Sequence, residues 1–204
     1  MTAVNRRAPL AEPIARFRSL LEEATAMPRE RLPEPTAFAL GTCDPETGRP
    51  AVRMLLLKDV DERGFVFYTN YQSRKGHELL ANPNAAMCFH WQAMEMQVRV
   101  EGRAHPVEPA EADVYFASRA RGSQIGAWAS EQSRVISEEG LLERRVQEFE
   151  RRFEGTPVAR PPHWSGFRLT PERIEFWKGM PSRLHRRELY TKRGDGWEVE
   201  ILFP

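Results

Sequence analysis

Cationic and hydroxyl-bearing side chains cluster at the ends of two strand-like segments in residues 53–76, RMLLLKDVDERGFVFYTNYQSRKG. The set comprises four cations and three hydroxyl groups: Arg53, Lys58, Arg74, Lys75, Tyr68, Thr69 and Ser73. Ser73 is also the expected N-cap of a short helix, whose free backbone N–H groups attract anions. Because a buried unpaired charge is costly, the pattern indicates a phosphate-binding site. The alternative is a solvated strand end followed by a capped helix.

A second set of polar side chains follows at steps of four residues, namely Tyr115, Arg119 and Ser123. On a helix or helix-like turn, this spacing aligns a phenol, a guanidinium and a hydroxyl along one side. These groups would suit a second phosphate. In the alternative interpretation, Tyr115 borders the core and Arg119 is a surface charge.

A third set lies in EFWKGMPSRLHRRELY, where Trp177 is followed by Arg183, His185 and Arg187 in alternation. On an extended strand these three side chains would share one face. A cationic row of this kind favours an anionic or electron-rich group facing it.

The remaining features exclude several classes of function. No histidine or cysteine spacing suits a metal, and there is no GxSxG, GxGxxG or P-loop motif. The net charge of +1 provides no general attraction for nucleic acid. No apolar stretch approaches the roughly 20 residues that span a bilayer, and no signal segment follows the start. We therefore expect a cytoplasmic protein that binds neither nucleic acid nor membrane, with Cys43 and Cys88 as buried free thiols.

The elements that must position these residues follow from hydrophobic periodicity. Residues 1–11 are polar and are expected to form a flexible tail, and residues 12–204 a single domain. Helices are predicted at 12–27, 73–83, 108–120, 123–130 and 137–153. Within them, the buried positions should include Leu79, Leu80 and Val114. Strands are predicted at 36–44, 51–59, 64–70, 85–91, 94–107, 166–179 and within 183–204. Short strands with close turns favour an antiparallel barrel or sandwich with helices outside.

Seven of these motifs together resemble the pyridoxamine/pyridoxine 5'-phosphate oxidase family. They follow one another in the family's order: RMLLLK, VFYTN, SRKGHEL, SQIGAW, SEQS, IEFW and RLHRR. The resemblance extends from about Ala11 to the end of the chain. It implies an FMN-binding split barrel that works as a homodimer, with flavin sites at the subunit interface.

The resemblance also implies roles for individual residues. The flavin would be bound by residues from most of the motifs: Arg53, Met54, Leu55, Leu56, Leu57, Lys58, Tyr68, Thr69, Arg74, Lys75, Gln97, Gln132, Ser133, Trp177 and Arg187. The substrate would be bound by Lys58, Tyr115, Arg119, Ser123, Arg183, Leu184 and His185. Among these, Arg183 and His185 would reach the pyridine end and act in catalysis.

The reaction implied is oxidation of pyridoxamine or pyridoxine 5'-phosphate to pyridoxal 5'-phosphate. A hydride would pass from C4' of the substrate to flavin N5, and O2 would reoxidise the flavin to give hydrogen peroxide. One alternative is a related flavin oxidase for another aromatic, such as a phenazine precursor. A second is a non-catalytic flavin- or haem-binding split barrel. Tyr115 and Arg119 argue against the former and the RLH motif against the latter.

Overall fold

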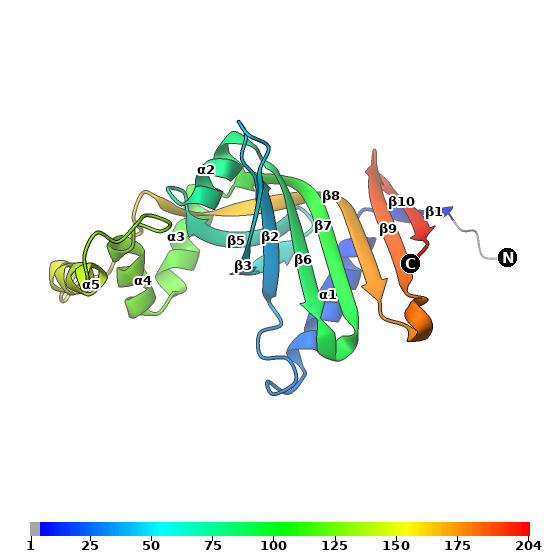
Figure 1. The fold of residues 1–204 in the computed structure, drawn as a ribbon, viewed down its shortest axis with the longest axis horizontal. Helices are drawn as coiled ribbons and strands as arrows, with labels where there is room; N and C mark the ends of the chain where they lie inside the picture. The colour runs from blue at the N-terminus through cyan, green and yellow to red at the C-terminus, as the bar shows by residue number, and fades with distance from the viewer. Residues whose placement is uncertain (1–4) are drawn as a thin grey trace.

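The computed structural model describes residues 5–204 as one antiparallel sheet with helices packed around it (Figure 1). Its ten strands are β1 (Asn5–Pro9), β2 (Ala37–Cys43), β3 (Pro50–Leu56), β4 (Asp59–Asp61), β5 (Gly64–Asn70), β6 (Asn84–Trp91), β7 (Met96–Pro106), β8 (Trp164–Lys178), β9 (Arg186–Arg193) and β10 (Gly196–Leu202). Its helices are α1 (Glu12–Thr25), α2 (Arg74–Ala81), α3 (Pro109–Ser118), α4 (Arg121–Ala129) and α5 (Leu141–Arg152), with short 3-10 helices η1 (Gln92–Met94) and η2 (Pro181–Arg183). The predicted class, mainly β with flanking helices, is confirmed.

The sheet branches at β8, its longest strand. The main path runs β1-β10-β9-β8-β7-β6-β2-β3, while β5 also pairs with β8 and carries β4. The first part of β8 pairs with β5 and the last part with β9, whereas β7 accompanies both parts. The register between β7 and β8 shifts at Glu101/Gly102. A Cβ atom on Gly102 would lie 2.1 Å from the carbonyl oxygen of Thr170, so only glycine allows the strands to approach here.

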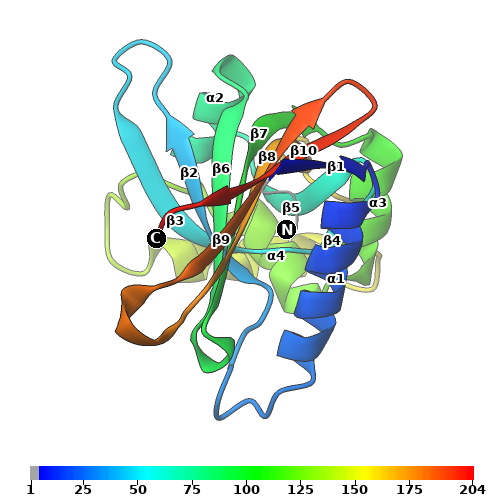
Figure 2. The same cartoon turned by 90° about the vertical axis from the view of Figure 1, so that its right-hand side faces the viewer.

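Aromatic rings fill the space between α1 and the sheet. Phe17 of α1 is fully buried, and its ring lies 4.8 Å from that of Phe65 and 4.9 Å from that of Phe89. Phe38 and Phe67 extend the same cluster. Figure 2 shows α1 running alongside the sheet. Burial of these rings contributes roughly 1.5–3 kcal/mol each, which fixes the scaffold that carries the polar residues.

The expected flexible tail is wrong for residues 5–9. They form β1, which pairs along its whole length with β10, and residues 1–4 lie outside the described part. Arg6 forms an ion pair with Glu12 and donates a hydrogen bond to the Tyr190 hydroxyl (3.1 Å). The strand is held mainly by backbone pairing and by this polar contact, and of residues 6–9 Ala8 alone joins the main core. Hydrophobic periodicity therefore could not reveal it.

Two helical faces also differ from the prediction. In α3 the buried residues are Ala112 and Phe116, whereas Val114 is 74% exposed. In α2 Leu79 is buried but Leu80 is exposed. Both helices are short, so the few apolar positions of each define its buried face poorly. No helix in residues 5–204 is long and apolar enough to cross a bilayer.

A second cluster of apolar side chains joins α3, α4 and α5 to the start of β8. Its buried members include Phe116, Ile125 and Trp164, and Phe149 and Phe153 of the α5 region pack against them. None of the α5 residues is fully buried. Cys43 and Cys88 are confirmed as free thiols, although both are half-buried rather than fully enclosed.

Candidate functional site

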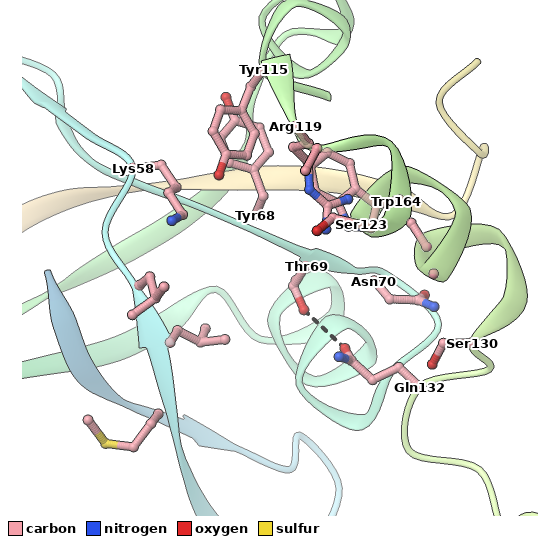
Figure 3. Close-up of a pocket in the computed structure, with 16 residues that line it drawn as sticks. Lys58, Tyr68, Thr69, Asn70, Tyr115, Arg119, Ser123, Ser130, Gln132 and Trp164 are labelled. Carbon is pink, nitrogen blue, oxygen red and sulfur yellow. Dashed lines mark hydrogen bonds between the residues drawn. The ribbon is translucent and has the colours of Figure 1, made fainter. Parts of the chain in front are cut away.

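A cavity of about 760 Å³ lies between the end of β3, β5 and the helices α3 and α4 (Figure 3). It brings together many of the residues predicted to bind ligands. From the set predicted to bind the flavin it is lined by Met54, Leu55, Leu56, Lys58, Tyr68, Thr69 and Gln132, and from the set predicted to bind the substrate by Lys58, Tyr115, Arg119 and Ser123. Two sets that lie apart in the sequence therefore share one cavity.

Arg119 is the cation with the least compensation in this cavity. Its Nη1 atom is buried without a hydrogen-bond partner in residues 5–204. The guanidinium carbon lies 4.6 Å from the centroid of the Trp164 ring and 5.6 Å from that of Phe116. Burial lowers the pKa of Arg119 below its ordinary value, although the guanidinium stays protonated at neutral pH. A buried donor without a partner at a cavity wall indicates an anionic ligand there.

Three aromatic rings stand in parallel at the same wall. Tyr68 stacks on Tyr115 at 4.1 Å and on Trp164 at 5.3 Å, with interplanar angles of 15° and 6°. Burial raises the pKa of Tyr68 to about 12, so its hydroxyl keeps its proton at neutral pH. The stack supplies flat apolar surface beside the polar groups of Lys58 and Ser123 (Figure 3).

Lys75 is a buried ammonium whose three hydrogen-bond acceptors are all neutral. Its Nζ donates to Thr69 Oγ1 (3.1 Å), Ser73 Oγ (3.2 Å) and Gln132 Oε1 (2.9 Å), and the residue is 7% exposed. Burial, reinforced by the nearby charge of Arg53, lowers the pKa of Lys75 to about 8. Because Thr69 and Gln132 also line the cavity, this charge lies directly behind its wall.

Arg53 and Arg74 lie next to Lys75 but face Glu78. Arg53 Nη2 is 3.3 Å and Arg74 Nε 2.7 Å from the Glu78 carboxylate, which is buried. Burial alone would raise the pKa of Glu78, but hydrogen bonds from Thr42 and Arg74 outweigh it and lower the pKa. Three cations against one carboxylate leave two positive charges when Lys75 is protonated. That excess matches a phosphate dianion.

The start of α2 holds these cations in place. Ser73 is the N-cap, as predicted, and its Oγ accepts a hydrogen bond from the backbone N–H of Gly76 (3.3 Å). Arg74 and Lys75 thus occupy the first turn, where the helix dipole favours anions. A Cβ atom on Gly76 would lie 2.4 Å from the carbonyl oxygen of Tyr71, so glycine is required for this packing.

The pH dependence of stability should report the burial of Lys75. Its folded-state pKa of about 8 lies below the ordinary value of 10.5, so between these values only the unfolded chain keeps the proton. The free energy of unfolding of the flavin-free protein should therefore rise with pH, by up to about 2 kcal/mol between about pH 7.5 and pH 9.5. Lys75→Met should abolish this rise in urea titrations, whereas Lys192→Met, at an exposed lysine, should keep it. An unchanged rise in Lys75→Met would contradict the assignment.

A second group of predicted residues meets elsewhere on the sheet. Gln97, Trp177 and Arg187 are directly paired neighbours on β7, β8 and β9. The His185 ring lies 4.6 Å from that of Trp177, and its Nδ1 accepts a hydrogen bond from the backbone N–H of Met180 (3.2 Å). In the neutral ring this leaves Nε2 as the N–H donor.

Arg187 is paired with a buried carboxylate. Its Nε and Nη2 atoms bond to the two oxygens of Glu175 (2.8 and 3.1 Å), and Arg99 forms an ion pair with the same carboxylate. Burial alone would raise the pKa of Glu175, but the hydrogen bonds from these two arginines outweigh it and lower the pKa. Glu175 therefore fixes the orientation of Arg187.

The predicted row of Arg183, His185 and Arg187 on one extended strand is wrong. Strand β9 begins only at Arg186, and Arg183 lies in η2. Ser182 and Arg183 both adopt left-handed backbone conformations, with φ of 59° and 61°. Such a turn is rare for residues other than glycine, and alternation in a short segment does not distinguish it from a strand. Arg183 and Leu184 are exposed, whereas His185 packs against Trp177.

Several predicted residues do not line the cavity in the described part of one chain. The wall of the cavity does not include the group around Trp177, which comprises Gln97, Trp177, His185 and Arg187. It does not include Arg183 or Leu184 either. Leu57 is buried in the main core. Ser133 lies outside, beside Arg74, with a φ of 75°. Conversely, Trp164, Asn70 and Ser130 line the cavity although the sequence analysis did not select them. The sequence feature that could have drawn attention to Trp164 is its position directly after the proline-rich segment 157–163.

Two family descriptions match the chain. "Pyridoxamine 5'-phosphate oxidase" covers residues 25–153, and "Pyridoxine 5'-phosphate oxidase C-terminal dimerisation region" covers residues 164–204. A protein from Myxococcus xanthus is 53% identical over 193 residues, covering 95% of this chain and 92% of the relative. A protein from Rhodospirillum rubrum is 55% identical over 199 residues, covering 95% and 96%. Both are named pyridoxine/pyridoxamine 5'-phosphate oxidase.

Two solved structures show the same architecture. PhzG from Burkholderia lata, in complex with tetrahydrophenazine-1-carboxylic acid, matches with a TM-score of 0.87 and 32% identity, covering 94% of this chain and 92% of that one. A pyridoxamine 5'-phosphate oxidase-related, FMN-binding protein from Nostoc punctiforme matches with a TM-score of 0.70 and 18% identity, covering 93% and 96%. The second similarity supports the fold alone.

Proposed function

Because the chain belongs to the pyridoxamine 5'-phosphate oxidase family of oxidoreductases, we propose that it oxidises pyridoxamine or pyridoxine 5'-phosphate to pyridoxal 5'-phosphate. FMN would be the cofactor and O2 the electron acceptor, with release of hydrogen peroxide. When the amine is the substrate, water would supply the aldehyde oxygen and ammonia would leave. The expected family and split-barrel fold are confirmed by the similarities. The cytoplasmic location and the single domain over residues 12–204 stay predictions.

The observation that carries the proposal is the Arg119 guanidinium at the cavity wall, whose buried Nη1 atom has no hydrogen-bond partner within residues 5–204. Tyr115 and Ser123 line the same wall and add two hydroxyl groups, and Lys58 adds a second cation. Together they provide charge and hydrogen bonds for one phosphate monoester. The aromatic stack beside them offers a flat apolar surface for a pyridine ring.

The cations behind the cavity wall formed by Thr69 and Gln132 suit the FMN phosphate. Lys75, Arg53 and Arg74 would bind it at the first turn of α2, where the acceptors of Lys75 among residues 5–204 are neutral. Thr69 and Gln132 would contact the flavin from the same wall, with Leu55 and Leu56 beside its rings. The bound flavin would supply the two-electron acceptor that no amino-acid side chain provides.

The protein's own contribution would be orientation and polarisation. The phosphate-binding residues would fix one end of the substrate so that its reacting carbon is held in a single position. Arg183 and His185 would contact the pyridine end and stabilise charge that develops at the 4' substituent. The Trp177 ring packs against His185, and Glu175 accepts hydrogen bonds from Arg187, so contacts within the chain orient both side chains.

The two groups of residues are best explained by a homodimer. In one chain the cavity excludes the group around Trp177, so a partner would have to supply it. The C-terminal dimerisation description covers Trp177 and His185. Exposed apolar side chains suit such an interface on β3 and at the C-terminal end: Val52, Met54, Leu56, Leu184, Ile201 and Phe203. We infer that flavin sites lie between two subunits.

One solved structure points to an alternative substrate class, a phenazine-type carboxylic acid. PhzG from Burkholderia lata, whose structure holds tetrahydrophenazine-1-carboxylic acid, is similar to this chain over nearly its whole length. Its 32% identity is lower than the 53–55% of the relatives named for vitamin B6 phosphates.

One assay tests the proposed function directly. The purified protein should show a flavin absorbance spectrum and, with pyridoxamine or pyridoxine 5'-phosphate in air, should produce hydrogen peroxide and a 4'-aldehyde in equal amounts. The non-phosphorylated forms should react much more slowly because they lack the anion that Arg119 would bind. Peroxide formed only with a non-phosphorylated aromatic would contradict the proposal.

A further inference from the structure

Trp164 lies directly against the guanidinium of Arg119. The distance from the Arg119 guanidinium carbon to the ring centroid is 4.6 Å, within the range of a cation–π contact. Tryptophan provides the strongest such contact among the aromatic residues. Figure 3 shows the two side chains together on one side of the cavity, with Ser123 beside them.

Nothing else in the described residues orients this guanidinium as strongly. The Nη1 atom of Arg119 is buried and has no hydrogen-bond partner within residues 5–204. The backbone N–H of Arg119 donates a hydrogen bond to the carbonyl oxygen of Phe116, which places the residue at the end of α3. This backbone bond does not set the direction of the side chain. The contact with the face of Trp164 is closer than that with Phe116, which lies 5.6 Å away.

Trp164 itself is held rigidly. It is 7% exposed and begins β8, where it pairs with Asn70 of β5. The Tyr68 ring stacks on it at 5.3 Å, and the Phe116 ring meets it edge-on at 5.1 Å. Arg160 donates a hydrogen bond to its carbonyl oxygen (2.8 Å). The ring is therefore a fixed surface against which a flexible cation can settle.

We propose that Trp164 is a positioning residue that holds the Arg119 guanidinium ready for the phosphate of the substrate. The inference rests on the proposed function, since it assigns the substrate's phosphate to Arg119. Trp164 would act through Arg119 and not on the reacting carbon. Its loss should therefore weaken binding of the phosphorylated substrate and leave the chemical step nearly unchanged.

Steady-state kinetics of the flavin-loaded enzyme can test this. Trp164→Leu should raise KM for pyridoxamine 5'-phosphate roughly tenfold while kcat changes less than about threefold. Trp164→Phe keeps a ring and should recover most of the affinity, with KM about threefold above wild type. Trp128→Leu is the matched control, because Trp128 also packs against an arginine, Arg152, at 5.1 Å but does not line the cavity. Its KM should equal that of wild type.

A double-mutant cycle separates positioning from general damage. In an Arg119→Met background, adding Trp164→Leu or Trp164→Phe should change KM less than about twofold, because no guanidinium remains to be held. Flavin absorbance and thermal unfolding check the fold. If Trp164→Leu does not fold, the same comparison is made with Trp164→Phe: its effect on KM should be smaller in the Arg119→Met background than in wild type.

The outcomes distinguish this inference from the proposed function. Calorimetry with pyridoxal 5'-phosphate should show the same loss of affinity in Trp164→Leu as the KM values. If wild type neither oxidises pyridoxamine 5'-phosphate nor binds pyridoxal 5'-phosphate, the proposed function fails and the inference with it. If wild type does both, but Trp164 variants lose the same affinity with and without Arg119, or lose kcat instead of KM, only the inference is overturned.

Discussion

Replacing Arg119 with methionine is expected to lower kcat/KM for pyridoxamine 5'-phosphate roughly 100-fold while the flavin stays bound. The substitution keeps most of the side-chain volume and removes a guanidinium whose buried Nη1 atom has no hydrogen-bond partner within residues 5–204. A charge-assisted contact to a phosphate that is largely shielded from water is worth about 3 kcal/mol, which corresponds to this factor. The measurement is peroxide production as a function of substrate concentration.

The substrate series and a neighbouring arginine supply the controls. Pyridoxamine without its phosphate should react with Arg119→Met about as slowly as with wild type, because Arg119 then has no anion to bind. Arg121→Met should behave as wild type, since Arg121 donates to the carbonyl oxygens of Phe153 and Thr156 outside the cavity. An equal loss with both forms of the substrate, or loss of the flavin, would exclude the assigned role.

Mixing two strongly impaired variants is expected to restore activity, measured at substrate concentrations well below KM. His185→Ala should lower kcat roughly 100-fold and leave the protein yellow, because the ring would polarise the substrate rather than bind the cofactor phosphate. If each site combines the cavity of one subunit with the Trp177 group of the other, then an Arg119→Met/His185→Ala heterodimer has one intact site. Random exchange should then recover about a quarter of wild-type activity.

The recovery depends on where the two residues act. Co-expression with two affinity tags would isolate the heterodimer, which should show about half of wild-type activity. Variants that both change the cavity, such as Arg119→Met with Ser123→Ala, should give no recovery when mixed. Absence of recovery in the Arg119/His185 mixture, with dimers verified by light scattering, would place both residues in the site of a single chain.

The sequence was informative where chemistry and local structure coincide. The N-cap Ser73 and the cations of α2 could be predicted because capping and the first-turn position are local properties. The side chains of Tyr115, Arg119 and Ser123 do line one cavity, as their spacing suggested. Their spacing was not that of one helix, however, because α3 ends at Ser118 and α4 begins at Arg121. The prediction was therefore right about proximity but not about the element.

What the sequence could not indicate depends on contacts between distant segments. Glu78 neutralises part of the charge of Arg53 and Arg74, which no spacing rule reveals. The turn at Ser182 and Arg183 replaces the expected strand because its backbone conformation is set by surrounding packing. Trp164 escaped notice because it reaches Arg119 only after β8 has paired with β5.

Strand β8 places strict limits on how this chain could tolerate insertions. Trp164 stands at its first residue beside the cavity, and Trp177 lies near its other end in the group that a partner would complete. Side chains alternate between the two faces of a strand, so one extra residue between these tryptophans would turn one of them to the opposite face. In a dimer whose two sites each combine residues of both subunits, one inserted residue would therefore displace a tryptophan from both sites. Length variation should therefore be confined to exposed loop segments such as residues 135–139, and be absent from β8.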